Sequence, residues 1–326
     1  MQTLALSAVL LLSLSEGAEP PAPQETTVIP APPVVTEAPA PQQLPDVAVL
    51  APEPSFVAPT RRDRIGRIWA PVEINGRGPF RLVLDTGSSH SAVTARVAEK
   101  LGIPVPYPGK TILRGTTGTT TVPMIPIRTL EVGDLLMEPR RLPIIPDALG
   151  GAEGVLGFEA LAGKRIHIDF RGDRITIMRS RNEKAPSGFV TIPVNFMRGR
   201  LLVVDAYLGG VRTKAIIDTG GQATLGNVAL REALARRRSG TVAVTDDVVG
   251  ATLDVQTGDR IATPAIVMGD ILVRNAAMTF ADFMIFTHWK MTAEPAMLIG
   301  MDVLGLLDTL IIDYRRRELQ VRLRRG

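Results

Sequence analysis

Apolar and polar residues alternate along two stretches of the chain, 68–84 and 201–217, and a glycine-containing pair interrupts each stretch once. The pair is Asn-Gly in the first stretch and Gly-Gly in the second. Alternation with a period of two predicts strands with one buried face, and such pairs connect neighbouring strands in tight hairpins. We therefore expect a β-hairpin in each stretch, with its second strand running directly into the tripeptide Asp-Thr-Gly.

Three further features follow each hairpin in the same order. They are a helix-like stretch with apolar residues three and four apart (91–103 and 227–239), an apolar strand that runs into a glycine and then a short helix (154–161 and 297–305), and an Ile-Asp-aromatic strand (165–177 and 309–323). The shared order indicates an internal duplication. The pattern predicts an all-β fold with short helices, divided into an N-terminal lobe at 61–185 and a C-terminal lobe at 186–326.

The first 60 residues differ in composition from the rest of the chain. Residues 4–14 form an apolar run, so we predict that residues 1–18 are a signal peptide; an uncleaved anchor or a misassigned start are the alternatives. Residues 19–60 are rich in proline and contain no glycine, which predicts a disordered linker or a pro-segment. We expect an exported protein in a bacterial periplasm, and this segment could tether its body to a membrane or cell wall.

Composition narrows the chemistry. Of the 326 residues 45% are apolar, which is enough to build a core. There is no cysteine, and the three histidines lie far apart, so we expect no disulfide, no metal site and no cofactor. The formal net charge is +4, but no basic run is interleaved with aromatic residues, which make up only 4% of the chain. We therefore expect no nucleic-acid partner.

The two copies of Asp-Thr-Gly, at residues 85–87 and 218–220, are the strongest candidates for chemistry. A single copy is most simply a turn, because aspartate, threonine and glycine all favour turns. Two copies at equivalent places in a repeat can instead form a pair of facing carboxyl groups. Ionising both groups costs a large free energy, so the pair shares one proton. Such a pair can take a proton from a water molecule and polarise a carbonyl group. Asp85 and Asp218 are therefore the candidate catalytic residues.

These motifs resemble those of the retropepsin-like aspartic proteases, with two such domains fused in tandem over about residues 65–325. The apolar-apolar-Gly elements at 155–157 and 298–300 match the same family. The resemblance implies two pseudo-symmetric β-barrel lobes, as in the bilobal pepsins, with the active site at their interface. It implies one aspartate from each lobe, and hence a monomer that is complete by itself.

The resemblance also implies roles for the residues that follow each aspartate. The hydroxyl groups of Thr86 and Thr219 would reach across the pseudo-twofold axis to the opposite loop. Gly87 and Gly220 would let the two loops approach closely. These residues are therefore the candidate supports of the active-site loops.

The residue after each tripeptide differs between the two halves. It is Ser88 in the first half and Gly221 in the second. The Ser88 hydroxyl would bond to the outer oxygen of Asp85 and favour its charged form, which Gly221 cannot do for Asp218. We therefore predict that Asp218 carries the shared proton more often.

Two glycine-containing stretches, 111–122 and 248–255, are candidates for the hairpin flaps that cover the substrate in this family. The residues expected to contact substrate are Arg114, Gly115, Thr116, Val249 and Gly250. Ordinary surface hairpins are the alternative for both stretches. If they are flaps, their closure would exclude water from the aspartates.

Together these features predict an aspartic endopeptidase that cleaves extended segments of a protein or peptide substrate. The alternative from another class is a catalytically silent peptide-binding module with the same bilobal cleft. A third reading is an enzyme that stays inactive until the proline-rich segment is removed.

Overall fold

The computed structural model describes residues 67–132, 135–198, 200–237 and 242–324, and the backbone of three short strands that precede them. The predicted signal peptide (1–18) and linker (19–60) otherwise lie outside the described residues. No helix in the described part of the chain is long and apolar enough to cross a membrane.

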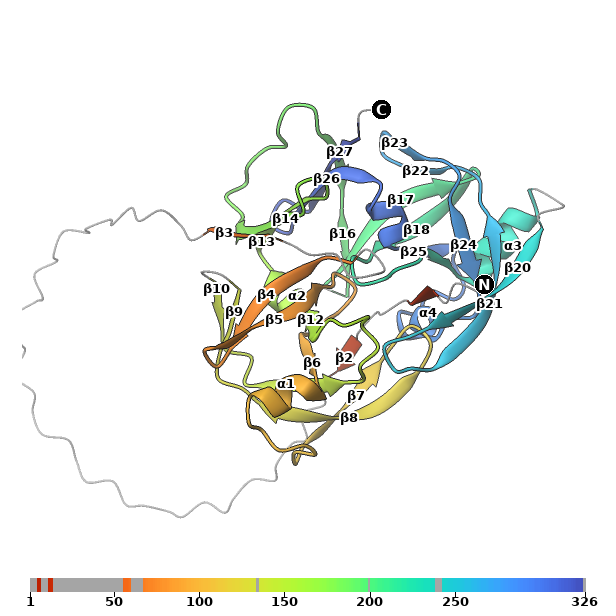
Figure 1. The fold of residues 1–326 in the computed structure, drawn as a ribbon. Helices are drawn as coiled ribbons and strands as arrows, with labels where there is room; N and C mark the ends of the chain where they lie inside the picture. The colour runs from red at the N-terminus through yellow and green to blue at the C-terminus, as the bar shows by residue number, and fades with distance from the viewer. Residues whose placement is uncertain are drawn as a thin grey trace, which may run out of the picture.

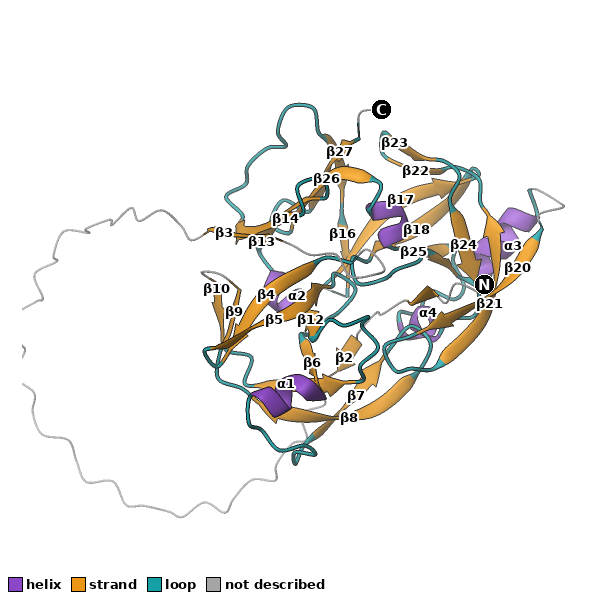
Figure 2. Cartoon of the chain, in the orientation of Figure 1, coloured by secondary structure: helices purple, strands orange, loops and turns teal. Residues whose placement is uncertain are grey.

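The chain is built mainly of β-strands, as expected, and its helices are short (Figure 2). The helices are α1 (Ala95–Lys100), α2 (Phe158–Leu161), α3 (Val228–Ala235), α4 (Met284–His288) and α5 (Met301–Leu304). Both predicted helix-like stretches contain a helix, α1 or α3, although each helix is shorter than the stretch over which the apolar residues recur. The short helices α2 and α5 each follow the glycine of an apolar strand, also as predicted.

The two predicted hairpins are confirmed. The first consists of β4 (Trp69–Ile74) and β5 (Arg77–Leu84), and the second of β17 (Leu201–Leu208) and β18 (Val211–Ile217). Both residues of each connecting pair have a positive φ, which is the geometry that the Asn-Gly and Gly-Gly pairs favour. The second strand of each hairpin is fully buried over its last three residues, and the aspartate follows directly.

The first sheet is formed mainly by the N-terminal half of the described chain. Its strand order is β10 (Leu135–Met137), β9 (Leu130–Val132), β4, β5, β12 (Gly154–Leu156), β6 (Ala92–Thr94), β11 (Arg141–Ile145), β8 (Thr119–Pro126), β7 (Lys110–Arg114) and β2 (Leu11–Ser13). Because β12 pairs in parallel with β5, it lies beside the strand that leads into Asp85.

The second sheet repeats this order with the strands of the C-terminal half. Its order is β23 (Ile271–Val273), β22 (Ile266–Met268), β17, β18, β25 (Ala296–Ile299), β19 (Leu225–Gly226), β24 (Ala277–Phe280), β21 (Val255–Ala262), β20 (Ala243–Val249) and β1 (Ala5–Leu6), with β16 (Asn195–Met197) beside β17. Strand β25 pairs in parallel with β18, as β12 does with β5. The two sheets lie on opposite sides of the molecule in Figure 1.

A third sheet takes strands from both halves. Its order is β15 (Val190–Pro193), β27 (Glu318–Leu323), β26 (Leu307–Asp313), β13 (Lys164–Asp169), β14 (Arg174–Arg179) and β3 (Ser55–Pro59). The two Ile-Asp-aromatic strands, β13 and β26, pair with each other in its middle. This sheet therefore joins the two halves edge to edge (Figure 1).

The strand orders run from one open edge to another within the described residues. The closed barrel that we expected for each half is therefore not seen. One continuous apolar cluster underlies all three sheets, since it contains Leu82 of the first, Leu208 of the second and Ile312 of the third. The strands that lead into both aspartates are thus anchored in a common core.

Candidate active site

Asp85 and Asp218 occupy equivalent places at the ends of two buried strands. Asp85 follows β5 and its backbone N–H donates to the carbonyl of Leu156, at 3.1 Å. Asp218 follows β18 and its N–H donates to Ile299, at 3.0 Å. The acceptors belong to the apolar-apolar-Gly elements, so these elements hold the start of each aspartate loop in place.

The two threonines join the aspartate loops to each other. The Thr86 hydroxyl donates to the carbonyl of Ile217 at 2.7 Å, and the Thr219 hydroxyl donates to Leu84 at 2.7 Å. Each threonine N–H in turn donates to the hydroxyl of the opposite threonine, at 3.2 and 3.1 Å. Because all of these groups are buried, the reciprocal bonds fix the two loops against one another.

The glycines bring each loop against the opposite carboxyl group. A Cβ atom at Gly87 would lie 2.8 Å from Oδ1 of Asp218, which is too close for any real side chain. A Cβ at Gly220 would overlap the carboxyl group of Asp85. Only glycine fits at either position while the two loops keep this arrangement.

The paired carboxyl groups are completely buried, and this raises the pKa of both. For Asp85, burial is the main cause and the neighbouring Asp218 adds to it. Burial likewise raises the pKa of Asp218, to about 7, against the hydrogen bonds that its charged form accepts. Two buried acids in contact therefore hold a proton at a pH at which an exposed aspartate has lost it.

The expected role of Ser88 is wrong in its detail. Its hydroxyl donates to the carbonyl of His90 at 2.7 Å and does not bond to Asp85. The backbone N–H of Ser88 donates to Oδ1 of Asp85 instead, at 2.9 Å, beside that of Gly87. The N–H groups of Gly220 and Gly221 bond to Asp218 in the same way, so the residue after the tripeptide does not distinguish the two aspartates.

Arg67 is a neighbour of the pair that the sequence did not reveal. It is fully buried just before β4, and its charge lowers the pKa of Asp218. The charge of Arg67 therefore favours the ionised form of Asp218, and the prediction that Asp218 carries the shared proton more often stays a prediction. Arg67 lies in a basic stretch of the sequence, and such stretches are typical of solvent-exposed surface.

A second acid, Glu159 or Asp302, supports each aspartate loop through hydrogen bonds that are only partly buried. In the first half, Glu159 accepts a hydrogen bond from the N–H of Ser91, whose hydroxyl accepts one from Gly157 at 3.0 Å. In the second half, Asp302 accepts from both the N–H and the hydroxyl of Thr224, at 3.0 and 2.7 Å.

The Thr224 hydroxyl accepts in turn from the N–H of Gly300, at 3.2 Å. Burial raises the pKa of both Glu159 and Asp302. An acid two residues after the glycine of each apolar-apolar-Gly element, Gly157 and Gly300, was a signal in the duplicated sequence that could have identified these supports.

The two predicted flap stretches form hairpins whose tips touch. Strands β7 and β8 form the first hairpin, in which Arg114 ends β7 and Gly115 and Thr116 lie in the turn. Strands β20 and β21 form the second, in which Val249 ends β20 and Gly250 follows it.

Close contacts join the two turns. The Thr117 hydroxyl donates to the carbonyl of Asp254 at 2.7 Å, and a Cβ at Gly118 would overlap the Asp254 side chain. A Cβ at Gly250 would likewise overlap Thr117. Glycine at these places allows the two tips to meet, as the approach of the β7–β8 and β20–β21 hairpins in Figure 1 illustrates.

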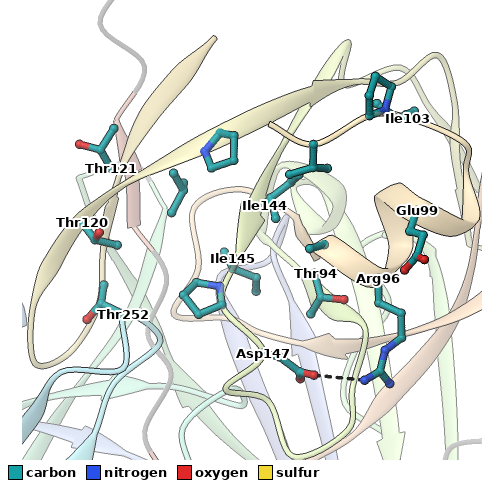
Figure 3. Close-up of a pocket in the computed structure, with 16 residues that line it drawn as sticks. Thr94, Arg96, Glu99, Ile103, Thr120, Thr121, Ile144, Ile145, Asp147 and Thr252 are labelled. Atoms are coloured by element: carbon teal, nitrogen blue, oxygen red, sulfur yellow. Dashed lines mark ion pairs between the residues drawn. The ribbon is translucent and has the colours of Figure 1, made fainter. Parts of the chain in front are cut away.

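A cavity of about 850 Å³ lies away from the aspartates. It is bounded by α1, the outer part of β8 and the end of β11, with the Arg96–Asp147 ion pair at its rim (Figure 3). Neither Asp85 nor Asp218 lines it. The described residues contain no group of three or more side chains suited to hold a metal ion.

Comparison with known families agrees with this geometry. Residues 70–160 match the aspartyl protease family model. The matched stretch runs from β4 through Asp85 and the β7–β8 hairpin to α2. The match supports an aspartyl protease family and a hydrolase activity. The second aspartate lies outside this stretch, in the half whose sheet has the same strand order. No match was found among curated proteins.

Proposed function

We propose that the protein is an aspartic endopeptidase in which Asp85 and Asp218 together activate a water molecule. The observation that carries the proposal is the reciprocal bonding of Thr86 and Thr219, which joins the two loops that carry the buried carboxyl groups. A turn role for Asp-Thr-Gly would not require two copies to be locked to each other. A shared proton is the chemical outcome of that arrangement.

In the proposed reaction, the ionised carboxylate takes a proton from the water as it attacks the scissile carbonyl carbon. The protonated carboxyl group donates to the carbonyl oxygen, and the resulting tetrahedral intermediate then releases the amine after a proton reaches its nitrogen. Because the proton is shared, either carboxyl group can serve as the base, and the charge of Arg67 favours the ionised form at Asp218. No covalent bond to the enzyme is formed.

We further propose that the two halves are pseudo-symmetric lobes, about residues 61–185 and 186–326, that arose by duplication. The equal strand order of the first two sheets supports this interpretation. A substrate would lie extended between the lobes and under the β7–β8 and β20–β21 hairpins, which would act as flaps. With one aspartate in each lobe, a monomer is sufficient for catalysis.

Export is proposed from the sequence of the N-terminal segment. An apolar run followed by a proline-rich stretch fits a protein that is sent to the periplasm and held near a membrane or cell wall. Measuring activity before and after the linker is cut would show whether it also acts as a pro-segment.

Cleavage of a diverse peptide library by the full-length protein tests the proposal. We expect the parent to cut peptides and the Asp85→Asn and Asp218→Asn variants to lose at least about a thousandfold in kcat, because either change removes the shared proton pair. Arg128→Gln, on an exposed loop residue, is the matched control and should retain activity. Peptides that bind to the parent but are never cut would support the silent binding module instead.

A further inference from the structure

Four basic residues from three elements gather beside the β7–β8 hairpin. Arg114 ends β7, Arg198 and Arg200 lie in the connection between β16 and β17, and His288 ends α4. Arg114, Arg200 and His288 are half-buried and Arg198 is exposed, so the group is open to solvent on one side.

Packing onto α4 brings these elements together. The N–H of Ile285 in α4 donates to the carbonyl of Thr116, in the turn of the β7–β8 hairpin, at 3.2 Å. On the other side, Met197 and Leu201, which flank the arginine-containing connection, belong to the same apolar cluster as Ile285 and Phe286. The hairpin turn and the connection thus contact one short helix, and the helix carries His288 at its end.

The charges of this group act on one another. Burial is the main cause that lowers the pKa of His288, and the charges of Arg114, Arg198 and Arg200 lower it further. Burial and the charge of Arg198 also lower the pKa of Arg200. Within the described residues, no ion pair joins Arg198 or Arg200 to a carboxylate, and the Nε of Arg200 is buried without a hydrogen-bond partner. Like charges gathered around an unused buried donor are suited to bind an anion.

The edge of β7 next to this group can accept an extended chain. Strand β2, residues Leu11–Ser13, pairs antiparallel with Ile112–Arg114, and Leu11 lies opposite Arg114. A peptide that adds to the same edge would therefore pass the basic group in a fixed register, with alternate side chains pointing toward each face.

We propose that Arg114, Arg198, Arg200 and His288 form a specificity subsite that selects a substrate with an aspartate or glutamate side chain at one position. This inference rests on the proposed endopeptidase function and names the class of its substrate. A carboxylate fits because the guanidinium group offers paired donors that match its two oxygens. At neutral pH His288 is uncharged and supplies one more hydrogen bond.

Paired peptides test the subsite. Each pair has one sequence cut by the parent enzyme, with glutamate or glutamine at a single position, and the position is moved along the peptide. We expect glutamate to raise kcat/KM on the order of tenfold over glutamine at one position, and this ratio to shrink toward one in Arg198→Gln and Arg200→Gln. The exposed Arg128→Gln is the matched control and should keep the parent ratio.

The outcomes separate this inference from the proposed function. Equal cleavage of all pairs would overturn the subsite while leaving the endopeptidase intact. A glutamate advantage that is the same at every position would also overturn it, since general attraction to a basic protein would then explain the rates. If no peptide is cut, the endopeptidase fails, and fluorescence anisotropy of the same labelled pairs decides whether Arg200 still selects glutamate.

Discussion

At the scale of single residues, the buried pair Asp85 and Asp218 couples the proposed catalysis to stability. The same burial that keeps a proton on the pair makes full ionisation costly for the folded state. Such a buried pair is therefore a weak point of the fold at high pH, and replacing one of the two acids by a neutral residue should change the stability with a predictable sign.

Asp218→Asn should stabilise the protein at pH 8. The pKa of Asp218 is raised to about 7 in the folded state, from an ordinary value of 3.8, so the folded state binds the proton more tightly. Its contribution to stability is complete below the unfolded pKa and is lost as the pH rises through about 7. Thermal unfolding should show a Tm about 5 °C above that of the parent at pH 8, and a much smaller gain at pH 4.

Asp205→Asn is the control for this measurement. The hydrogen bond and charge of Lys214 lower the pKa of Asp205, so this carboxylate stabilises the folded state above its unfolded pKa. Its loss should give no gain in Tm at pH 8. A pH-independent rise in Tm for Asp218→Asn would contradict the assigned origin of the effect.

The sequence identified the candidate site residues whose motif is repeated in both halves. Asp85 and Asp218 stand out because the same tripeptide follows the same hairpin twice. The role expected for the Ser88 hydroxyl was wrong, because the direction of a hydroxyl depends on acceptors such as His90 that are close only in the folded loop. Arg67 was missed because its burial depends on packing between elements and leaves no local pattern.

At the scale of elements, each aspartate loop depends on the short helix that follows its apolar strand. Asp302 of α5 accepts hydrogen bonds from the N–H and hydroxyl of Thr224, and Glu159 of α2 accepts one from Ser91. These carboxyl groups are not part of the proposed reaction. They connect the loop to a helix that is anchored in the core.

Asp302→Ala should destabilise the protein by about 2 kcal/mol, because it leaves the buried N–H of Thr224 without its acceptor. Urea unfolding measures this change, and kcat should fall as well because the Asp218 loop loses its support. Asp302→Asn keeps an acceptor oxygen and should cost less than half as much. Equal losses in the two variants would show that the negative charge matters and the hydrogen bonds do not.

Contact between the hairpin tips is expected to matter for activity more than for stability. Gly118→Ala would place a Cβ in overlap with the Asp254 side chain and separate the two turns. We expect kcat/KM to fall on the order of tenfold, since closure over the substrate is lost, while Tm changes by less than about 2 °C. Peptide cleavage and thermal unfolding of the same samples measure both effects.

The second variant in this test is Gly118→Ala combined with Asp254→Gly. Removing the Asp254 side chain relieves the overlap and should restore part of the lost kcat/KM. No recovery in the double variant would argue that the hairpins do not act as flaps through this contact.

The elements themselves were largely predictable, but their partners were not. Alternation identified the β4–β5 and β17–β18 hairpins to within a residue or two, because a hairpin is a local structure. The pairing of β13 with β26 joins residues far apart in the chain, and the sequence of either strand alone does not indicate which strand it pairs with. The expectation of closed barrels failed at this level, since edge strands such as β10 and β23 leave both sheets open.

At the scale of the whole molecule, the third sheet makes the two halves interdependent. Strands β13 and β14 come from the first half and β26 and β27 from the second, so the fold of either half leaves an unpaired edge without the other. A buried ion pair lies at this junction, where Arg165 contacts Asp313 at 2.8 Å and Gln320 at 2.7 Å. Ser180 also donates to Asp313, at 2.7 Å.

Arg165→Met should therefore destabilise the whole chain and not one half of it. The change leaves the Asp313 carboxylate, which is fully buried, without its cation, and such losses typically cost about 3–5 kcal/mol. Joint replacement, Arg165→Met with Asp313→Leu, removes the stranded charge and should recover most of that loss. Urea unfolding of both variants should follow a single transition, by fluorescence of Trp69 in the first half and Trp289 in the second, recorded separately in single-tryptophan versions. Transitions that separate for the two probes would show that the halves fold independently and that the shared sheet does not couple them.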